Sequence, residues 1–145
     1  MELDETDHQI LACLQKDGRI SNADLAGRIH RSESACHRRV RRLEEAGVIQ
    51  GYSAVIDQAA IGKAVNVFVE ITLASTGEET LNAFEESVRA CDDVITGYFM
   101  TGDADYLLHI AAADTEDYER IYRTHLSRFP GIARIRTSFA LRAVR

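Results

Sequence analysis

The stretch Ser32–Glu45 concentrates positive charge in a chain that is acidic as a whole. Between positions 31 and 42 there are five arginines and a single glutamate, whereas the 145-residue chain has a formal net charge of −6. Apolar residues recur every three or four positions, so they share one face of a predicted helix, with most arginines opposite or beside it. These apolar residues are Cys36, Val40 and Leu43. A positive helix surface on a negative protein indicates binding to a phosphate backbone.

The exposed side chains of this helix fall into two groups of candidate DNA contacts. The N-terminal half of a recognition helix lies nearest the base edges of the major groove, whereas phosphate contacts position the protein without reading sequence. Ser32 is the predicted N-cap at this surface, and Arg39, nearer the packed edge, can pair with an acid instead. The alternative to DNA binding is that these charged side chains only form a solvated face of the helix. The predicted base contacts are Ser34, His37 and Arg38, and the predicted phosphate contacts are Arg31, Arg41 and Arg42.

A second candidate site is the turn at positions 102–105, with the sequence G-D-A-D. A glycine-containing turn exposes backbone amides and carbonyls that can bind the carboxylate and ammonium groups common to all amino acids. Its two aspartates add acceptors for an ammonium group, so a ligand with a cationic side chain also stays possible. The alternative is a hairpin turn with solvated aspartates and no ligand. The candidate ligand-binding residues here are Tyr98, Met100, Thr101, Gly102, Asp103, Ala104 and Asp105, and the family resemblance described below is what makes them predicted effector-binding residues.

Three short helices are predicted to position the basic stretch. The first spans 4–16 and is capped by Asp4, the second starts after Ser21, and a short connection leads to the third. A helix, a tight turn and a second helix with an exposed basic face form the helix-turn-helix pattern. Residues 48–56 are rich in β-branched and aromatic side chains, which predicts a short strand or wing, and 57–63 is the predicted linker.

The remainder of the chain alternates strand and helix patterns in the order β-α-β-β-α-β, which predicts a ferredoxin-like domain. Its helices would cover one face of the sheet and leave the other open, and an exposed apolar sheet face predicts at least a symmetric dimer. The predicted elements are strand 65–73, helix 78–89, strands 94–101 and 106–113, a helix capped by Asp114 and strand 132–141. The predicted apolar residues of the open face are Phe68, Tyr98, Met100 and Phe139.

Composition and the placement of cysteine and histidine argue against a membrane protein, a metal site and an enzyme. With 46% hydrophobic and 28% charged residues the chain is typical of globular proteins, and it has no run of about 18 apolar residues that would predict a membrane span. Cys13, Cys36 and Cys91 are isolated, so we expect reduced thiols in a cytoplasmic protein, with no metal site and no cofactor. His109 and His125 are expected to be structural, because no nucleophile–base constellation accompanies them.

At this point the chain resembles the Lrp/AsnC, or feast/famine, family of bacterial and archaeal transcription regulators, over nearly its whole length. The combination and order of the motifs are more specific than any one of them. The motifs are L-D-E-T-D-H-Q-I-L (3–11), L-Q-K-D-G-R-I-S-N-A-D-L-A (14–26), S-E-S-A-C-H-R-R-V-R-R-L-E-E-A-G-V-I-Q-G-Y (32–52), T-G-D-A-D-Y-L-L (101–108), F-P-G-I (129–132) and T-S-F (137–139).

The resemblance implies dimers, often assembled further to octamers, with an amino acid bound between subunits. Thr137 and Ser138 would then reach the effector from a neighbouring chain. Two positions depart from the family pattern. Ala104 stands where the turn commonly has an aromatic residue, so an effector cannot be transferred from relatives, and Glu33 replaces a common proline, where an acid suits the helix dipole.

The sequence therefore predicts an α+β protein with an N-terminal winged helix-turn-helix domain (1–50), a wing and linker (51–63) and a C-terminal ferredoxin-like βαββαβ domain (64–145). The predicted function is transcription regulation, with double-stranded DNA, a small effector and further copies of the chain as partners, and no membrane. The alternatives are an architectural DNA-binding protein without a ligand and, least favoured, an enzyme on a ferredoxin-like domain. The sequence identifies neither the operator nor the effector.

Overall fold

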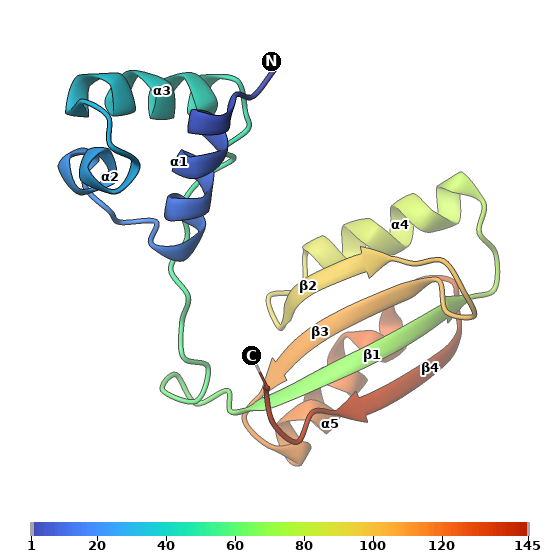
Figure 1. Ribbon diagram of the computed structural model, residues 1–145. Helices are drawn as coiled ribbons and strands as arrows, with labels where there is room; N and C mark the ends of the chain where they lie inside the picture. Colours follow the sequence, from blue (N-terminus) through green and yellow to red (C-terminus); the bar gives the residue numbers. More distant parts are fainter. Residues whose placement is uncertain (1, 145) are drawn as a thin grey trace. The chain divides into compact units, whose positions relative to one another are not determined.

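The computed structural model describes residues 2–144 and divides them into two compact units, one ending at Val55 and the other starting at Ile56 (Figure 1). The boundary falls within the segment predicted to be wing and linker. Each unit has its own hydrophobic core.

Three helices form the N-terminal unit: α1 (Glu5–Lys16), α2 (Asn22–Ile29) and α3 (Glu33–Glu45). All three predicted N-caps are confirmed. The Asp4 side chain accepts the Asp7 N–H in a reciprocal capping box, and the hydroxyls of Ser21 and Ser32 accept amides three residues on. These caps satisfy amides that have no partner within the helix, so they fix where each helix begins.

The connection between α2 and α3 is tight because α2 ends at a left-handed residue. His30 has a φ of 53°, and the Arg31 N–H donates to the Ala26 carbonyl at 3.0 Å. This turn brings the apolar stripes of the helices together over a small core. The buried core residues are Ile10, Leu25, Ala26, Ile29, Cys36 and Leu43.

The prediction of a strand within 48–56 is wrong, because the structure has no helix or strand from 50 to 57. The amides of Val48 and Ile49 are taken up by the Leu43 carbonyl in the C-terminal turn of α3. A strand also needs a partner strand, and the described part of this unit contains none. Of the side chains that suggested a strand, Ile49 packs against the helical core, whereas Val48, Tyr52, Val55 and Ile56 are exposed.

The C-terminal unit has the predicted βαββαβ order. Its four strands are antiparallel neighbours in the order β2-β3-β1-β4, and α4 and α5 are the two connecting helices (Figure 1). Strand β2 stops two residues earlier than predicted, because the Met100 N–H donates to the Asp105 carbonyl and starts the turn. The elements are β1 (Val65–Leu73), α4 (Glu78–Arg89), β2 (Val94–Phe99), β3 (Tyr106–Ala112), α5 (Thr115–Thr124), a 3-10 turn (Leu126–Arg128) and β4 (Ile132–Phe139).

Alternation along β1 separates the two faces of the sheet. Val67, Val69 and Ile71 are fully buried in the core under the helices, whereas the residues between them point to the open face. The prediction that Phe139 lies on the open face is wrong. It pairs with Val67 across β1 and β4 and therefore shares its face, with its ring 5.3 Å from that of Tyr118 in α5.

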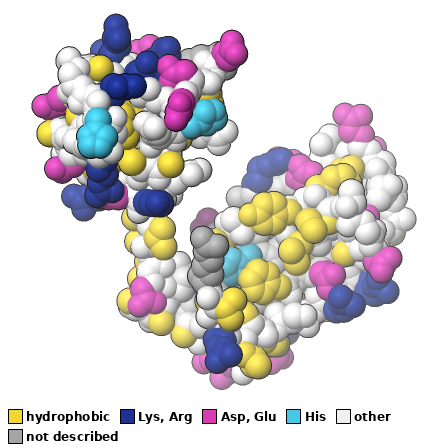
Figure 2. Space-filling view, in the orientation of Figure 1, with side chains coloured by type: hydrophobic (Ala, Val, Ile, Leu, Met, Phe, Trp, Pro, Cys, Tyr) yellow, Lys and Arg dark blue, Asp and Glu magenta, His cyan; other side chains and the backbone are white. Residues whose placement is uncertain are grey.

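Apolar side chains nevertheless gather on the open face (Figure 2). Phe68, Tyr98 and Met100 are 37%, 58% and 40% exposed, so the open face of the sheet presents an apolar surface. His109 stacks on Phe68 with ring centroids 4.8 Å apart and bonds Asn66 through Nε2 at 2.8 Å. Burial lowers the pKa of His109, so the imidazole is neutral at pH 7.

Candidate DNA-binding and effector-binding sites

Helix α3 presents most of its arginines to solvent. Cys36 and Leu43 face the core and are fully buried, as the apolar spacing predicted. Figure 2 shows Lys and Arg side chains, with some acidic ones among them, over the side of the unit that α3 forms. The exposed residues that the sequence predicted as DNA contacts are Arg31, Ser32, Ser34, His37, Arg38, Arg41 and Arg42.

The N-terminal half of α3 borders a shallow hollow. It is lined by Glu33, Ser34 and His37 from α3 together with Asn22 from α2. His37 and Arg38 make no hydrogen bond or ion pair with other residues of the described chain, so their donors are available to a ligand. The hollow combines hydroxyl, amide and imidazole groups, which suit the mixed donors and acceptors of base edges.

The three C-terminal arginines of α3 differ in their partners. Arg39 donates to Asp4 at 2.7 Å and to Asp7 at 2.8 Å, which confirms that it pairs with acids at the packed edge. Those hydrogen bonds raise the pKa of Arg39. Arg42, predicted as a phosphate contact, also donates to Asp7, at 2.6 Å, with about half of its side chain exposed. Among residues 2–144, Arg41 pairs only with Glu45, one turn on, at 3.0 Å.

Ser32 and Arg31 are held by local contacts. The Ser32 hydroxyl accepts the Ala35 N–H at 3.3 Å, so the hydroxyl serves as the cap of α3. Arg31 donates to the Thr6 hydroxyl at 3.5 Å, which is a long hydrogen bond and leaves the guanidinium exposed.

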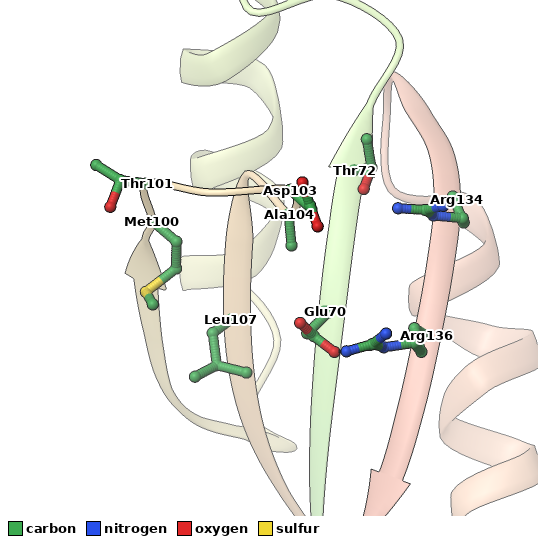
Figure 3. Close-up of a pocket in the computed structure, with 9 residues that line it drawn as sticks. All are labelled: Glu70, Thr72, Met100, Thr101, Asp103, Ala104, Leu107, Arg134 and Arg136. Atoms are coloured by element: carbon green, nitrogen blue, oxygen red, sulfur yellow. Dashed lines mark hydrogen bonds and ion pairs between the residues drawn. The ribbon is translucent and has the colours of Figure 1, made fainter.

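The C-terminal unit has a cavity of about 330 Å³ at one end of the open sheet face. Strands β1, β3 and β4 form its floor and the β2–β3 turn its rim, so residues more than 60 positions apart in sequence meet there (Figure 3). This volume lies within the range of pockets that hold small ligands. The lining residues are Glu70, Thr72, Met100, Thr101, Asp103, Ala104, Leu107, Arg134 and Arg136.

Asp105 fixes the turn that forms the rim. Its N–H donates to the Ile71 carbonyl at 2.8 Å, and its carboxylate accepts the Leu73 N–H at 2.7 Å. Gly102 has a φ of +108°, a backbone conformation that favours glycine. The two aspartates of the turn therefore differ: Asp105 is bound to the backbone of β1, whereas Asp103 is exposed at the cavity.

The structure brings four of the nine predicted effector residues together in this cavity: Met100, Thr101, Asp103 and Ala104. Gly102 and Asp105 belong to the same turn without lining the cavity, and Tyr98 and Ser138 lie exposed elsewhere on strands β2 and β4. The Thr137 hydroxyl is bonded to the Tyr118 hydroxyl and faces the helices.

Sequence reasoning missed the part of the cavity that β1 and β4 supply. Alternation along 65–73 is enough to place Glu70 and Thr72 on the face away from the core, but it does not show which strand lies beside them. The register places Glu70 opposite Arg136, and the two side chains are joined at 2.6 Å. The next outward pair, Thr72 and Arg134, lies further along the same two strands.

Cys91, Asp93 and His125 form a further polar cluster, with one donor atom of each within 4.8 Å of the others. Asp93 is also 3.3 Å from Lys63 and 3.7 Å from Arg120. These two cations balance the carboxylate, and burial raises the pKa of the Cys91 thiol, so the cluster has the character of an ion-pair network.

No helix within residues 2–144 is long and apolar enough to cross a membrane.

The comparisons with known proteins cover both units. Residues 3–50 match the family model "Winged helix-turn-helix DNA-binding", and 66–145 match "Lrp/AsnC ligand binding domain". The Bkd operon transcriptional regulator of Pseudomonas aeruginosa is 41% identical over 143 residues, which are 99% of this chain and 94% of that protein. The leucine-responsive regulatory protein of Escherichia coli is 38% identical over 144 residues, 99% of this chain and 88% of that protein.

Two solved structures of similar fold are also those of transcriptional regulators. A Neisseria meningitidis transcriptional regulator in complex with L-Met has a TM-score of 0.93 at 29% identity, and an Agrobacterium tumefaciens AsnC family transcriptional regulator has 0.92 at 34%. Each likeness covers 99% of this chain and 93% of the other. The chain belongs to the Lrp/AsnC family of transcriptional regulators, with an N-terminal helix-turn-helix that binds DNA and a C-terminal ligand-binding domain.

Proposed function

We propose that this protein regulates transcription by binding specific DNA sequences through α3, and that an amino acid bound by its C-terminal unit modulates this activity. The observation that carries the proposal is the exposed basic face of α3 within a helix-turn-helix, in a chain whose second unit matches a ligand-binding domain. The relatives are transcriptional regulators, so the proposed function involves binding and no catalytic step.

In the proposed DNA complex, Ser34, His37 and Arg38 read base edges from the N-terminal half of α3. Their exposure and the hollow beside Ser34 and His37 support this role. Arg31 and Arg41 hold phosphates, with Ser32 capping the helix at the same surface. Arg42 joins them with the guanidinium donors that Asp7 leaves free, because half of its side chain is exposed.

In the proposed effector site, the cavity beside the β2–β3 turn holds an amino acid. Support comes from the cavity's position on the unit that matches the ligand-binding domain, and from a solved relative that is a complex with L-Met. Another relative is named as leucine-responsive. The predicted contacts Gly102 and Asp105 shape this site through the backbone of the turn.

The same proposal includes a homo-oligomer, a dimer that can assemble to an octamer, in the cytoplasm where the DNA lies. The exposed apolar side chains on the open sheet face support it, because such patches mark interfaces. Tyr98 lies in this surface, and Ser138 is exposed on edge strand β4, from which it would approach a neighbouring subunit; Thr137 lies on the same strand but its hydroxyl is bonded to Tyr118 on the helix side.

Selection of bound DNA from a random pool, with and without a mixture of the common amino acids, tests the function. We expect enrichment of a symmetric sequence and a change in its affinity when the amino acids are present. Absence of any enriched sequence would overturn sequence-specific regulation. Long footprints that ignore the amino acids would instead indicate an architectural DNA-binding protein.

A further inference from the structure

Glu33 places a carboxylate in the surface that is proposed to read DNA. It is the first residue of α3, it is exposed, and it lines the shallow hollow beside the first turn of the helix. Of the other two acids of α3, Glu44 accepts from the Tyr52 hydroxyl at 2.9 Å. Glu45 accepts from Arg41 at 3.0 Å. The Glu33 carboxylate has no hydrogen bond or ion pair within the described chain, so its oxygens are available to a ligand.

The chemistry of a carboxylate restricts what Glu33 can contact on DNA. An ionised carboxylate only accepts hydrogen bonds, and it is repelled by the negative phosphates. The donors that the major groove presents are the N4 amino group of cytosine and the N6 amino group of adenine. On adenine the N7 acceptor lies beside the amino group and repels a carboxylate, whereas the edge of cytosine carries the donor alone. Cytosine is therefore the base that suits Glu33.

His37 supplies a donor beside this acceptor. It lies four residues after Glu33, so the two side chains are neighbours on one face of α3, and both line the same hollow. An imidazole carries an N–H donor in either protonation state. In a C·G pair, the O6 and N7 acceptors of guanine lie beside the amino group of cytosine. An acid and a histidine at this spacing therefore match the hydrogen-bonding pattern of one C·G pair.

We propose that Glu33 is a specificity-determining residue that selects a C·G base pair in the bound DNA, an inference that rests on the sequence-specific DNA binding proposed above. The Glu33 carboxylate accepts a hydrogen bond from the cytosine N4 amino group, and the His37 N–H donates to O6 or N7 of the paired guanine. Guanine or thymine in place of the cytosine puts an acceptor, O6 or O4, against the carboxylate. Binding to such a site is weaker, because two acceptors meet where a hydrogen bond is lost.

A role for Glu33 in helix stability alone leads to a different expectation. An acid in the first turn stabilises a helix through its macrodipole, whatever DNA the helix meets. Glu5 provides the matched control for this effect. It is the first residue of α1, it is exposed, and it follows a side-chain N-cap, as Glu33 does in α3. Glu5→Ala therefore removes one first-turn acid and one negative charge from the same unit without changing α3.

Selection of bound DNA from a random pool, with the full-length wild type, Glu33→Ala and Glu5→Ala, tests the proposal. We expect the wild type and Glu5→Ala to enrich a site with a C·G pair at one position of each half-site. In Glu33→Ala the discrimination at that position should fall about tenfold, while the other positions keep their preference. Glu33→Gln, which adds a donor beside the acceptor, should admit adenine there as well. Base preferences that Glu33→Ala leaves unchanged overturn the proposal.

A base analogue then tests the contacted group. Replacing the selected cytosine by 2-pyrimidinone, which lacks the N4 amino group, should weaken binding of the wild type about tenfold more than binding of Glu33→Ala. Equal losses in the two proteins overturn the contact, as does a uniform gain of affinity for all sequences in Glu33→Ala and Glu5→Ala alike, which shows charge repulsion only. An enriched site whose base preferences do not depend on Glu33 removes this inference alone, whereas a wild type that enriches no sequence removes the sequence-specific function as well.

Discussion

The carboxylate of Asp7 on α1 accepts a hydrogen bond from Arg42 on α3 at 2.6 Å. Asp7 is fully buried, and its other oxygen accepts from Arg39 at 2.8 Å. One acid of the first helix therefore holds two arginines of the proposed recognition helix. This contact orients the basic face of α3 and directs part of its charge inward, so only some of the arginines counted in the sequence are free for DNA.

Asp7→Asn should lower the free energy of unfolding of the helical unit by about 1–3 kcal/mol, because it weakens two charge-assisted hydrogen bonds. Urea denaturation of the full-length protein, followed by far-ultraviolet circular dichroism, measures the change. Glu5→Gln is the control, since Glu5 is an exposed acid of the same helix without an ion pair in the described chain. An unchanged midpoint in Asp7→Asn would show that the network does not stabilise the unit.

Arg38→Ala and Arg41→Ala should affect DNA binding in different ways. Loss of a base contact at Arg38 should cost about 1–3 kcal/mol at one base pair and relax the preference there. Loss of a phosphate contact at Arg41 should weaken binding to all DNA sequences alike. It should also reduce the salt slope, which is the slope of the logarithm of the binding constant against the logarithm of the salt concentration, by about 1. The Arg41–Glu45 pair is exposed, so its removal should change stability little.

Binding isotherms at several salt concentrations, on the selected site and on single-base variants of it, distinguish these two outcomes. Arg123→Ala, on the C-terminal unit, controls for the loss of one positive charge. The division of roles along α3 is wrong if both variants reduce the salt slope equally and keep the same base preference.

Most of the fold follows from local patterns in the sequence. The cap at Asp4 and the alternation from Val65 to Leu73 each depend on residues a few positions apart, and both elements form as predicted. The strand expected at 48–56 fails because composition indicates a propensity but cannot supply a partner strand. A β-rich segment without a neighbour has no ladder to join.

The cavity could be predicted only on its turn side. Asp103 belongs to a recognisable G-D-A-D turn, whereas Arg134 reaches the same cavity through the pairing of β4 with β1, which is a long-range contact. Likewise, the sequence alone does not distinguish the roles of Asp103 and Asp105, which are both acids of the same turn. The hydrogen bond from the Leu73 amide distinguishes them, and it depends on how β1 meets the turn.

Gly131→Ala should destabilise the C-terminal unit by about 1–3 kcal/mol for two reasons. Gly131 has a φ of +76°, which strains a residue with a side chain, and an added Cβ would lie 2.7 Å from Cγ2 of Thr80 on α4. Thermal unfolding measures the loss. Gly62→Ala is the control, because its φ is +78° and its Cβ would have no atom within 4 Å. Equal losses in the two variants would mean that the contact with Thr80 is accommodated.

Asp117 should make the protein's stability depend on pH in the acid range. The Ala113 N–H donates to its carboxylate at 2.8 Å, and Arg120 and Lys63 lie beside it, which lowers the pKa of Asp117 from 3.8 to about 2. Because the folded-state pKa lies below the unfolded one, the folded state favours the ionised carboxylate. Its contribution of about 2 kcal/mol is present above about pH 5 and is lost as the pH falls towards 2.

Asp117→Asn should therefore unfold more easily than the wild type at pH 7, and the difference between the two should shrink between about pH 4 and pH 2. Urea denaturation at a series of pH values measures it, and Asp92→Asn controls for the loss of an exposed negative charge. A difference that stays constant down to pH 2 would mean that shape and hydrogen bonding at Asp117, rather than its ionisation, stabilise the junction of β3 and α5. We expect ionisation to contribute more to the stability because the Lys63 ammonium group pairs with both Asp117 and Asp93. With a neutral amide at position 117, Asp93 would be the one remaining carboxylate of this pair beside Lys63.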